Sequence, residues 1–133
     1  MSIFKKWFNN FISIFSKDRV TYNVNPSQDF LRICKVEKPP KNIDVVKGKI
    51  YFVVSQEKPK WALFHCPCGC KSVITLSLQT IHKPHWSLTH NKENLASLYP
   101  SVWRDVGCYS HFWLKDGSIS WCSDSGTKPL HGS

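Results

Sequence analysis

The segment Cys66-Pro67-Cys68-Gly69-Cys70 places three thiols within five residues. A disulfide between two members of such a run would be strained, whereas a metal ion needs only that the chain turn sharply around it. Pro67 fixes one φ angle and Gly69 permits a positive one, so the backbone can form this turn. We therefore predict a knuckle whose sulfurs converge on one ion.

Further ligands are expected downstream of the knuckle. Cys108 and His111 form a second pair at C-x-x-H spacing, and Cys122 ends the next extended run. Zinc is the ion we expect, because it takes sulfur and imidazole together in a tetrahedron. The candidate ligands outnumber the four positions of one tetrahedral ion, and we favour one site with spare ligands over two. Cys34 stands alone and is interpreted as a small buried apolar residue.

The compartment decides whether these six cysteines are ligands or disulfides. Residues 1–15 include Lys5 and Lys6, but Asn9 and Asn10 interrupt the apolar run and no small-residue cleavage site follows. No apolar stretch is long enough to span a bilayer. We therefore expect a cytoplasmic protein, in which clustered thiols bind metal.

The first segment has a helical pattern of its own. Apolar residues recur at three- and four-residue intervals from Ile3 to Phe15, which predicts an amphipathic helix over residues 1–19. Its wide aromatic face, with cations nearby, suits peripheral contact of residues 1–17 with a membrane interface or docking into a partner's groove. The alternative is that it covers the domain's own core, and both remain open.

After this helix, the pattern predicts strands. Segments rich in β-branched and aromatic residues alternate with turn signals at residues 20–24, 30–36, 50–54, 61–64, 72–78, 86–89, 111–114 and 118–121. Two hairpins are expected: one with the knuckle at its tip, the other closed by Lys115-Asp116-Gly117. The predicted fold is mostly β, a small α+β protein of zinc-stapled β-hairpins with the N-terminal helix.

Length and charge bear on the number of domains and on the class of partner. At 133 residues with a net charge of +9, the chain fits one β domain over residues 20–122, followed by a polar tail over 123–133 that we expect to be flexible. Five tryptophans among lysines raise the alternative of nucleic-acid binding. However, no C-x₂-C…H-x₃-H finger or recognition helix is present, so no specific nucleic acid is expected.

Peptidase chemistry has candidates but no complete motif. The metallopeptidase sequence H-E-x-x-H is absent, and a thiolate-rich zinc is usually structural. Ser110 and His111 are neighbours in a predicted strand and should point to opposite faces. Ser101, after Pro100, is the better nucleophile candidate, with His111 or His85 as the base. An ordinary turn serine is the commoner interpretation, and a cysteine left off the metal is a second candidate.

Several motifs together resemble a known family. Cys66-Pro-Cys-Gly-Cys70, Pro100-Ser101-Val102-Trp103-Arg104, Gly107-Cys108-x-Ser110-His111-Phe112-Trp113 and Trp121-Cys122 are similar to a small Cys-rich bacterial domain family of unknown function, found in operons for ubiquitin-like protein conjugation. The resemblance covers about residues 49–122 and leaves the N-terminal helix outside.

The resemblance implies a metal-binding protein that works beside a ubiquitin-like protein and its activating and conjugating enzymes. It also implies a peptidase that processes or removes the modifier. The family's metal positions fall on six residues here, Cys66, Cys68, Cys70, Cys108, His111 and Cys122. We rank such a zinc module first, then a non-enzymatic zinc-stabilised adapter, then a nucleic-acid binder.

Overall fold

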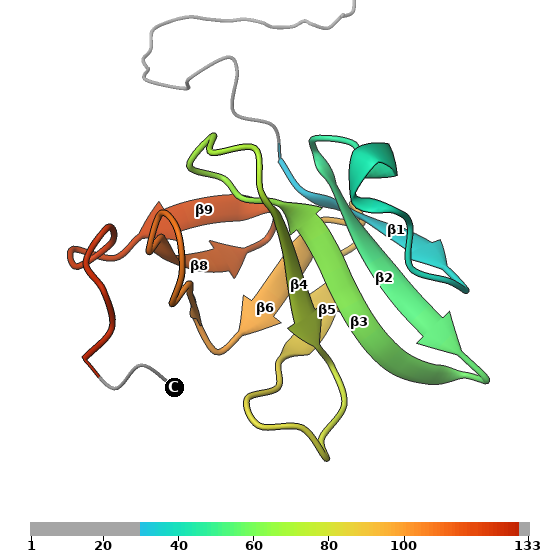
Figure 1. Cartoon of the computed structure of the whole chain (residues 1–133). Helices are drawn as coiled ribbons and strands as arrows, with labels where there is room; N and C mark the ends of the chain where they lie inside the picture. Colours follow the sequence, from blue (N-terminus) through green and yellow to red (C-terminus); the bar gives the residue numbers. More distant parts are fainter. Residues whose placement is uncertain (1–29, 131–133) are drawn as a thin grey trace, which may run out of the picture.

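The computed structural model describes residues 30–130 of the chain. These residues form nine strands and one short 3-10 helix, η1 (Asn42–Asp44), so the mostly β prediction is confirmed (Figure 1). The predicted N-terminal helix and the predicted strand at 20–24 lie outside the described residues. Within residues 30–130, no helix has the length and apolar character needed to cross a membrane.

The largest sheet contains the first four strands in the order β1-β2-β3-β4. Its strands are β1 (Arg32–Val36), β2 (Lys49–Ser55), β3 (Lys58–His65) and β4 (Val73–Ser77). The strands β1 and β2 pair in parallel, and the other pairs are antiparallel. The predicted hairpin around the cysteine knuckle is the β3–β4 pair, so the knuckle lies at one end of this sheet.

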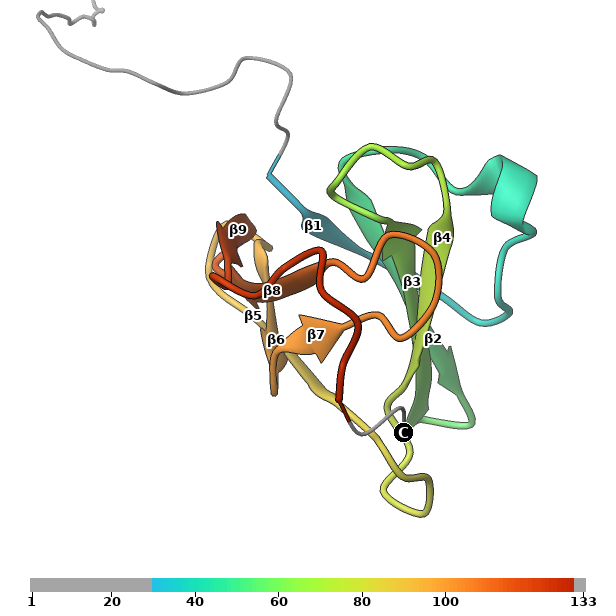
Figure 2. The same cartoon turned by 60° about the vertical axis from the view of Figure 1, so that its left-hand side comes forward.

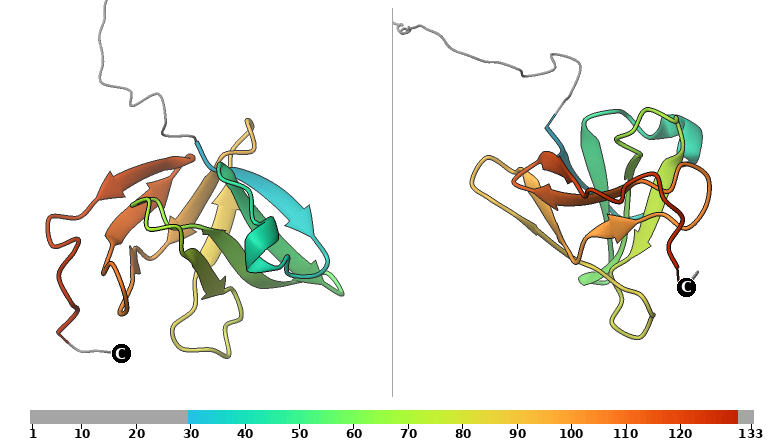
Figure 3. Two further views of the ribbon diagram at one scale, coloured as in Figure 1. Left: turned by 45° about the horizontal axis from the view of Figure 1, so that its top comes forward. Right: turned by 90° about the vertical axis from the view of Figure 1, so that its left-hand side faces the viewer.

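Two smaller sheets form from the second half of the chain. One pairs β5 (Ser87–His90) with β6 (Ala96–Tyr99), and the other has the order β7-β8-β9, from β7 (Val102–Trp103), β8 (His111–Lys115) and β9 (Ser118–Trp121). Asp116 and Gly117 have φ angles of 48° and 80° and close the predicted β8–β9 hairpin. Figures 2 and 3 show these small sheets lying across one face of the four-stranded sheet.

The main core fills the space between these layers. Phe64 of β3 meets Phe112 of β8 edge to face, with ring centroids 6.2 Å apart, and both side chains are fully buried. A second, smaller cluster on the other face of the large sheet joins Val45, Tyr51, Val53 and Leu63. Because both faces are covered, β2 and β3 have nearly continuous apolar runs instead of a strict alternation.

Candidate active site and metal centre

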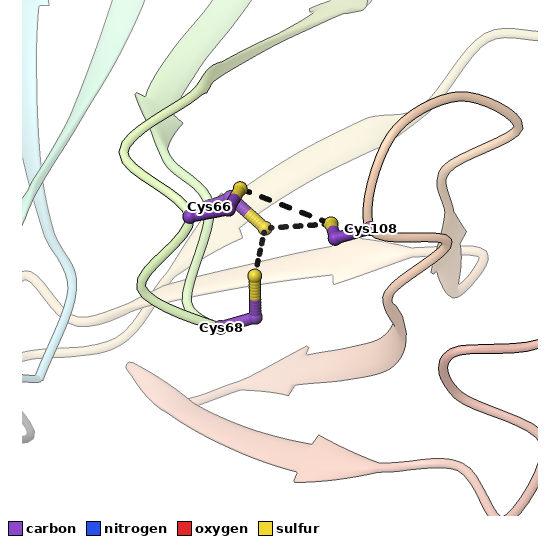
Figure 4. A group of neighbouring side chains, drawn as sticks. Cys66, Cys68 and Cys108 are labelled. Carbon is purple, nitrogen blue, oxygen red and sulfur yellow. Dashed lines mark hydrogen bonds between the residues drawn. The ribbon is translucent and has the colours of Figure 1, made fainter.

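The cysteine knuckle brings its sulfurs together with one from a distant loop. Cys66 follows β3, and its amide donates to the Ser72 carbonyl at 2.8 Å, which closes the β3–β4 hairpin. Gly69 has the positive φ, 89°, that the knuckle was expected to need. Cys108 comes from the loop between β7 and β8, and Figure 4 shows its sulfur pointing toward those of Cys66 and Cys68.

The spacing of these sulfurs suits a tetrahedral ion. The Cys66 sulfur lies 3.4 Å from that of Cys68 and 3.6 Å from that of Cys108, and Cys70 lies 3.8 Å from Cys108. A tetrahedral ion with metal–sulfur bonds of about 2.3 Å separates its sulfurs by about 3.8 Å. The group of Cys66, Cys68, Cys70 and Cys108 could therefore hold a metal ion.

Two polar residues surround this sulfur group. The Ser110 hydroxyl, which is buried, lies 3.0 Å from the Cys108 sulfur and 3.6 Å from that of Cys66. Arg104 directs Nη1 at the sulfurs of Cys70 and Cys108, at 3.7 and 3.6 Å. A cation and a hydroxyl in these positions would compensate the negative charge of metal-bound thiolates and orient them, as outer partners do in metal sites.

The thiols differ in how readily they ionise. Burial raises the pKa of Cys66 to about 12. Burial also raises the pKa of Cys108, but hydrogen bonds from the Ser110 hydroxyl and amide outweigh it, and the pKa falls to about 6. A hydrogen bond with the Ser72 hydroxyl lowers the pKa of Cys70. The cluster therefore contains at least one thiol, Cys108, that is mostly deprotonated at neutral pH.

The other two predicted ligands lie in a different group. His111 and Cys122 cluster with Asp124, their ligand atoms lying within 4.8 Å of one another. Burial, and then the negative charge of Asp124, raise the pKa of Cys122. Cys34 belongs to neither group and packs, half-buried, against the second core cluster.

A hydrogen-bonded chain links a serine, a histidine and an aspartate. The Ser101 hydroxyl lies 3.0 Å from Nε2 of His111, and Nδ1 of His111 lies 2.6 Å from Oδ1 of Asp124. These are the contacts that a hydroxyl nucleophile, its general base and an orienting carboxylate require. Asp124 had not been singled out in the sequence.

The strand register explains how Ser101 reaches His111. Trp103 of β7 pairs with His111 of β8, so their side chains share a face of the small sheet. Ser101 lies two residues before Trp103 in the extended chain and therefore points to that same face. Ser110, next to His111, points the other way, to the sulfur group, as expected for neighbours in extended chain. His85 donates instead from Nδ1 to the His82 carbonyl at 3.0 Å.

Residues 125–127, which follow Asp124, form hydrogen bonds with β7, β8 and the loop before β8, while the flexibility expected of the tail over residues 123–133 stays a prediction. The hydroxyl of Ser125 accepts from the His111 amide at 3.0 Å, and the Gly126 amide donates to the Tyr109 carbonyl at 2.8 Å. Trp103 donates from Nε1 to the Thr127 carbonyl at 3.1 Å. Ser125 makes its contact through its side chain, whereas Gly126 and Thr127 contribute main-chain groups.

Aromatic rings surround the linked residues. Trp103 stacks on the His111 ring, with centroids 4.2 Å apart and an interplanar angle of 2°. Trp86 donates from Nε1 to the Ser101 carbonyl at 3.2 Å. Tyr99 and Trp113 lie two residues from Ser101 and His111, respectively, and their exposed rings have centroids 6.0 Å apart. Because His111 and Trp113 alternate along β8, they share a face, so this exposed aromatic pair lies on the side of the small sheet that carries His111.

Comparison with known proteins agrees with this arrangement. Residues 35–122, more than half of the chain, match the sequence profile of a family described as bacterial ubiquitination-like system serine protease (BubE). The chain belongs to this family. Membership in the BubE family confirms the resemblance to proteins of ubiquitin-like conjugation operons. No curated protein and no solved structure matches the chain.

The matched range includes two members of the linked group but ends before the third. Ser101 and His111 fall within residues 35–122, whereas Asp124 lies just beyond them. The BubE family is described as a serine protease family, so Ser101, whose hydroxyl contacts a histidine, is the candidate nucleophile. All four cysteines of the sulfur group also fall within the match.

Proposed function

We propose that this chain is a serine peptidase of a bacterial ubiquitin-like conjugation system, which cleaves after the C-terminal tail of the modifier to process or remove it. The observation that carries the proposal is the continuous contact from Ser101 through His111 to Asp124. The modifier and its activating and conjugating enzymes are the partners, and a reducing cytoplasm is the compartment that keeps the thiols available.

The chemical step follows from the three contacts. Oγ of Ser101 attacks the carbonyl carbon of the scissile bond while its proton passes to Nε2 of His111. Asp124 accepts the hydrogen bond from Nδ1 and stabilises the imidazolium that forms. His111 then gives its proton to the leaving amine, and the ester on Ser101 remains. Water then attacks the ester while His111 takes its proton, and His111 returns that proton to Oγ of Ser101 as the modifier leaves with a free carboxylate.

The exposed aromatic surface next to Ser101 supports a polypeptide substrate. Tyr99 and Trp113 are 67% and 42% exposed, and each lies two residues from a member of the reacting pair. Large exposed rings are unfavourable in water unless a partner covers them. We assign the substrate segment beside the scissile bond as that partner, because the rings border Ser101 and His111.

The sulfur group is proposed to hold a structural zinc. Four thiolates complete a tetrahedron, so the ion has no open position for substrate or water. When bound, the ion fixes the Cys108 loop, whose chain enters β8 at His111 three residues later. The same ion joins that loop to the β3–β4 hairpin. Zinc therefore supports the geometry of the peptidase without taking part in its chemistry.

A cleavage assay tests the proposal. A fusion of the modifier to a reporter protein is incubated with the full chain and with its Ser101→Ala variant. Cleavage after the modifier's tail by the wild type, lost in a variant that keeps its metal and its melting temperature, supports a serine mechanism. If the wild type binds the fusion without cutting it over a long incubation, the chain is a non-enzymatic adapter instead.

A further inference from the structure

A second cluster of metal-ligating side chains lies on the Nδ1 side of His111, opposite the nitrogen that meets Ser101. It comprises His111, Cys122 and Asp124, whose ligand atoms are mutually within 4.8 Å. We propose that this cluster is a regulatory metal site, at which one thiophilic divalent ion such as Zn²⁺ binds and stops the peptidase. The inhibition rests on the proposed function, whereas the ion site stands on its own geometry.

The chemistry of the three ligands suits zinc. Imidazole nitrogen, thiolate sulfur and carboxylate oxygen are the ligand types that this ion accepts together, and three protein ligands leave a fourth position for water. The carboxylate and the thiolate balance the two positive charges of the ion. The Asp124 side chain is 47% exposed, so an ion can reach the cluster from solvent.

The main chain holds these ligands near one another. Cys122 donates its amide to the His111 carbonyl at 2.9 Å, and Ser125 donates its amide to the Cys122 carbonyl at 3.0 Å. The His111 amide in turn donates to the Ser125 hydroxyl at 3.0 Å. The backbone around each ligand is therefore tied to the backbone of the others, which reduces the entropy lost when an ion is bound.

Only small side-chain shifts separate this cluster from a tetrahedral site. Ligand atoms on one zinc ion lie about 3.3 to 3.6 Å apart, for bonds of about 2.0 to 2.3 Å. Nδ1 of His111 and Oδ1 of Asp124, now 2.6 Å apart, must move slightly apart, and the other pairs, at most 4.8 Å apart, must reach the same range. Movements of about an ångström at exposed or half-buried side chains meet this demand.

The cluster is distinct from the four-sulfur group. The two groups share no residue, and Cys66, Cys68, Cys70 and Cys108 by themselves complete one tetrahedron. Cys122 and His111 are thus not needed as ligands there. Two ions per chain, one structural and one regulatory, account for every cysteine except Cys34 in the described residues 30–130.

Binding at Nδ1 would stop proton transfer at the other ring nitrogen. A neutral imidazole carries one proton, and an ion on Nδ1 obliges that proton to sit on Nε2. His111 then donates at Nε2 and has no lone pair there to accept the proton of Ser101. The Cys122 thiol releases its proton to solvent as the sulfur binds, and no electron transfer is involved. The ion and the catalytic proton thus compete for one ring.

Calorimetric titration of the full chain with Zn²⁺ tests the site without using activity. The protein is first loaded with one equivalent, which fills the four-sulfur group, and is then titrated with zinc chloride. We expect the wild type to bind one further ion. Cys122→Ser should bind it at least 100-fold more weakly, because losing a direct ligand exceeds the 10- to 100-fold effect of an outer partner. Cys34→Ser should behave as the wild type.

Several results would overturn the site. It is wrong if the loaded wild type binds no further ion, or if Cys122→Ser binds one with unchanged affinity. Should Cys122→Ser fail to fold, Asp124→Ala serves as the second ligand variant for the same titration. Ser101→Ala, which removes no ligand, should retain the second ion.

A cleavage assay then separates this inference from the proposed function. Added Zn²⁺ should inhibit the wild type, while Cys122→Ser, with unchanged basal activity, should resist. A second ion that binds without slowing cleavage contradicts the regulatory role. If the second ion binds, but neither the wild type loaded with a single equivalent of zinc nor Cys122→Ser cleaves, the metal site stands and the peptidase proposal fails.

Discussion

Trp103 lies flat against His111, with ring centroids 4.2 Å apart and planes within 2° of parallel. The contact is fixed from both sides, since β7 pairs Trp103 with His111 and the indole Nε1 donates to the Thr127 carbonyl. A stacked indole restricts rotation of the imidazole and favours its positive form through the ring quadrupole. Trp103 is therefore a positioning residue for the proposed base.

Replacing this indole should slow the reaction without weakening substrate binding. We expect Trp103→Leu to lower kcat about tenfold with little change in KM, since aromatic pairs contribute about 0.5 to 1.5 kcal/mol. Trp103→Phe, which keeps a ring over His111, should recover much of the loss. Steady-state cleavage kinetics measure both. A rise in KM alone, with kcat unchanged, would place Trp103 in substrate binding instead.

The carboxylate of Asp124 can be tested by an isosteric change. Asp124→Asn should lower kcat by about 10⁴-fold, because an amide that donates to Nδ1 stabilises the wrong tautomer of His111. The melting temperature and the metal content of the four-sulfur group should not change. Asp105→Asn, at an exposed position, is the matched control. Equal activity of the two variants would remove Asp124 from the mechanism.

The aromatic surface beside Ser101 should contribute to substrate binding. Tyr99→Ala and Trp113→Ala are each expected to raise KM several-fold while kcat at saturation stays close to the wild type, because the rings contact substrate in both ground and transition states. Ile81→Ala changes a still more exposed apolar side chain and should have no effect. Unchanged KM in both aromatic variants would mean that the substrate lies elsewhere.

If the four-sulfur group holds a structural ion, cysteine variants should differ sharply in metal content and in folding. Cys66→Ser and Cys108→Ser should lose their metal and their cooperative melt, because structural zinc supplies folding free energy. Cys34 is half-buried on β1 and belongs to neither group of metal-ligating side chains, so Cys34→Ser should stay folded and keep its zinc. Elemental analysis and thermal denaturation under reducing conditions measure these outcomes. Protein that melts normally with no metal would refute a structural ion.

Acid should release this ion, and removal of the Ser110 hydroxyl should raise the pH at which the ion is released. Protons and metal compete for the thiolate, and the pKa of Cys108 is lowered from its ordinary 9.0 to about 6. The lowered pKa keeps the Cys108 thiol deprotonated at neutral pH, and protons begin to compete with the ion for this sulfur as pH falls through about 6. Ser110→Ala removes the hydroxyl that lowers this pKa, so the ion should be lost at a higher pH.

The release is followed with a zinc-sensitive dye across a pH series. Ser87→Ala, at an exposed position on β5, is the control and should release its ion at the wild-type pH. A Ser110→Ala variant that retains zinc to a lower pH than the wild type would reverse the sign of the predicted effect.

Strand pattern and turn chemistry predict seven of the nine strands of residues 30–130. The strand β7 has two residues, too short for a period to show. The strand β6 has four residues, as β5 and β9 do, but Ala-Ser-Leu-Tyr contains no β-branched residue to mark it. The parallel pairing of β1 with β2 depends on contacts across the fold that no local pattern specifies. The helix expected over residues 1–19 stays a prediction.

The candidate site was predictable where residue types are rare, and missed where they are common. Three cysteines in five residues identify the knuckle, and Ser101 and His111 stood out beside motif residues. Asp124 lies in a polar segment whose composition resembles a loose tail, so nothing marks its carboxylate. C-x-x-H spacing suggested that Cys108 and His111 share one ion. His111 is the first residue of β8, and its side chain points to the face opposite Ser110 and the sulfur group, so it does not reach the ion proposed for Cys108.

Along the sequence Ser101 comes first, His111 second and Asp124 last, all within the strands β7, β8 and β9 and the turns that flank them. The well-known serine hydrolases place the same three residue types in the orders Ser-Asp-His, His-Asp-Ser and Asp-His-Ser. The proposed order Ser101, His111, Asp124 matches none of them, and a catalytic role for these residues would make the chain a further case of convergence on one geometry. Relatives with this order will be recognised by superposing three side chains, and searches for the older sequence signatures will pass over them.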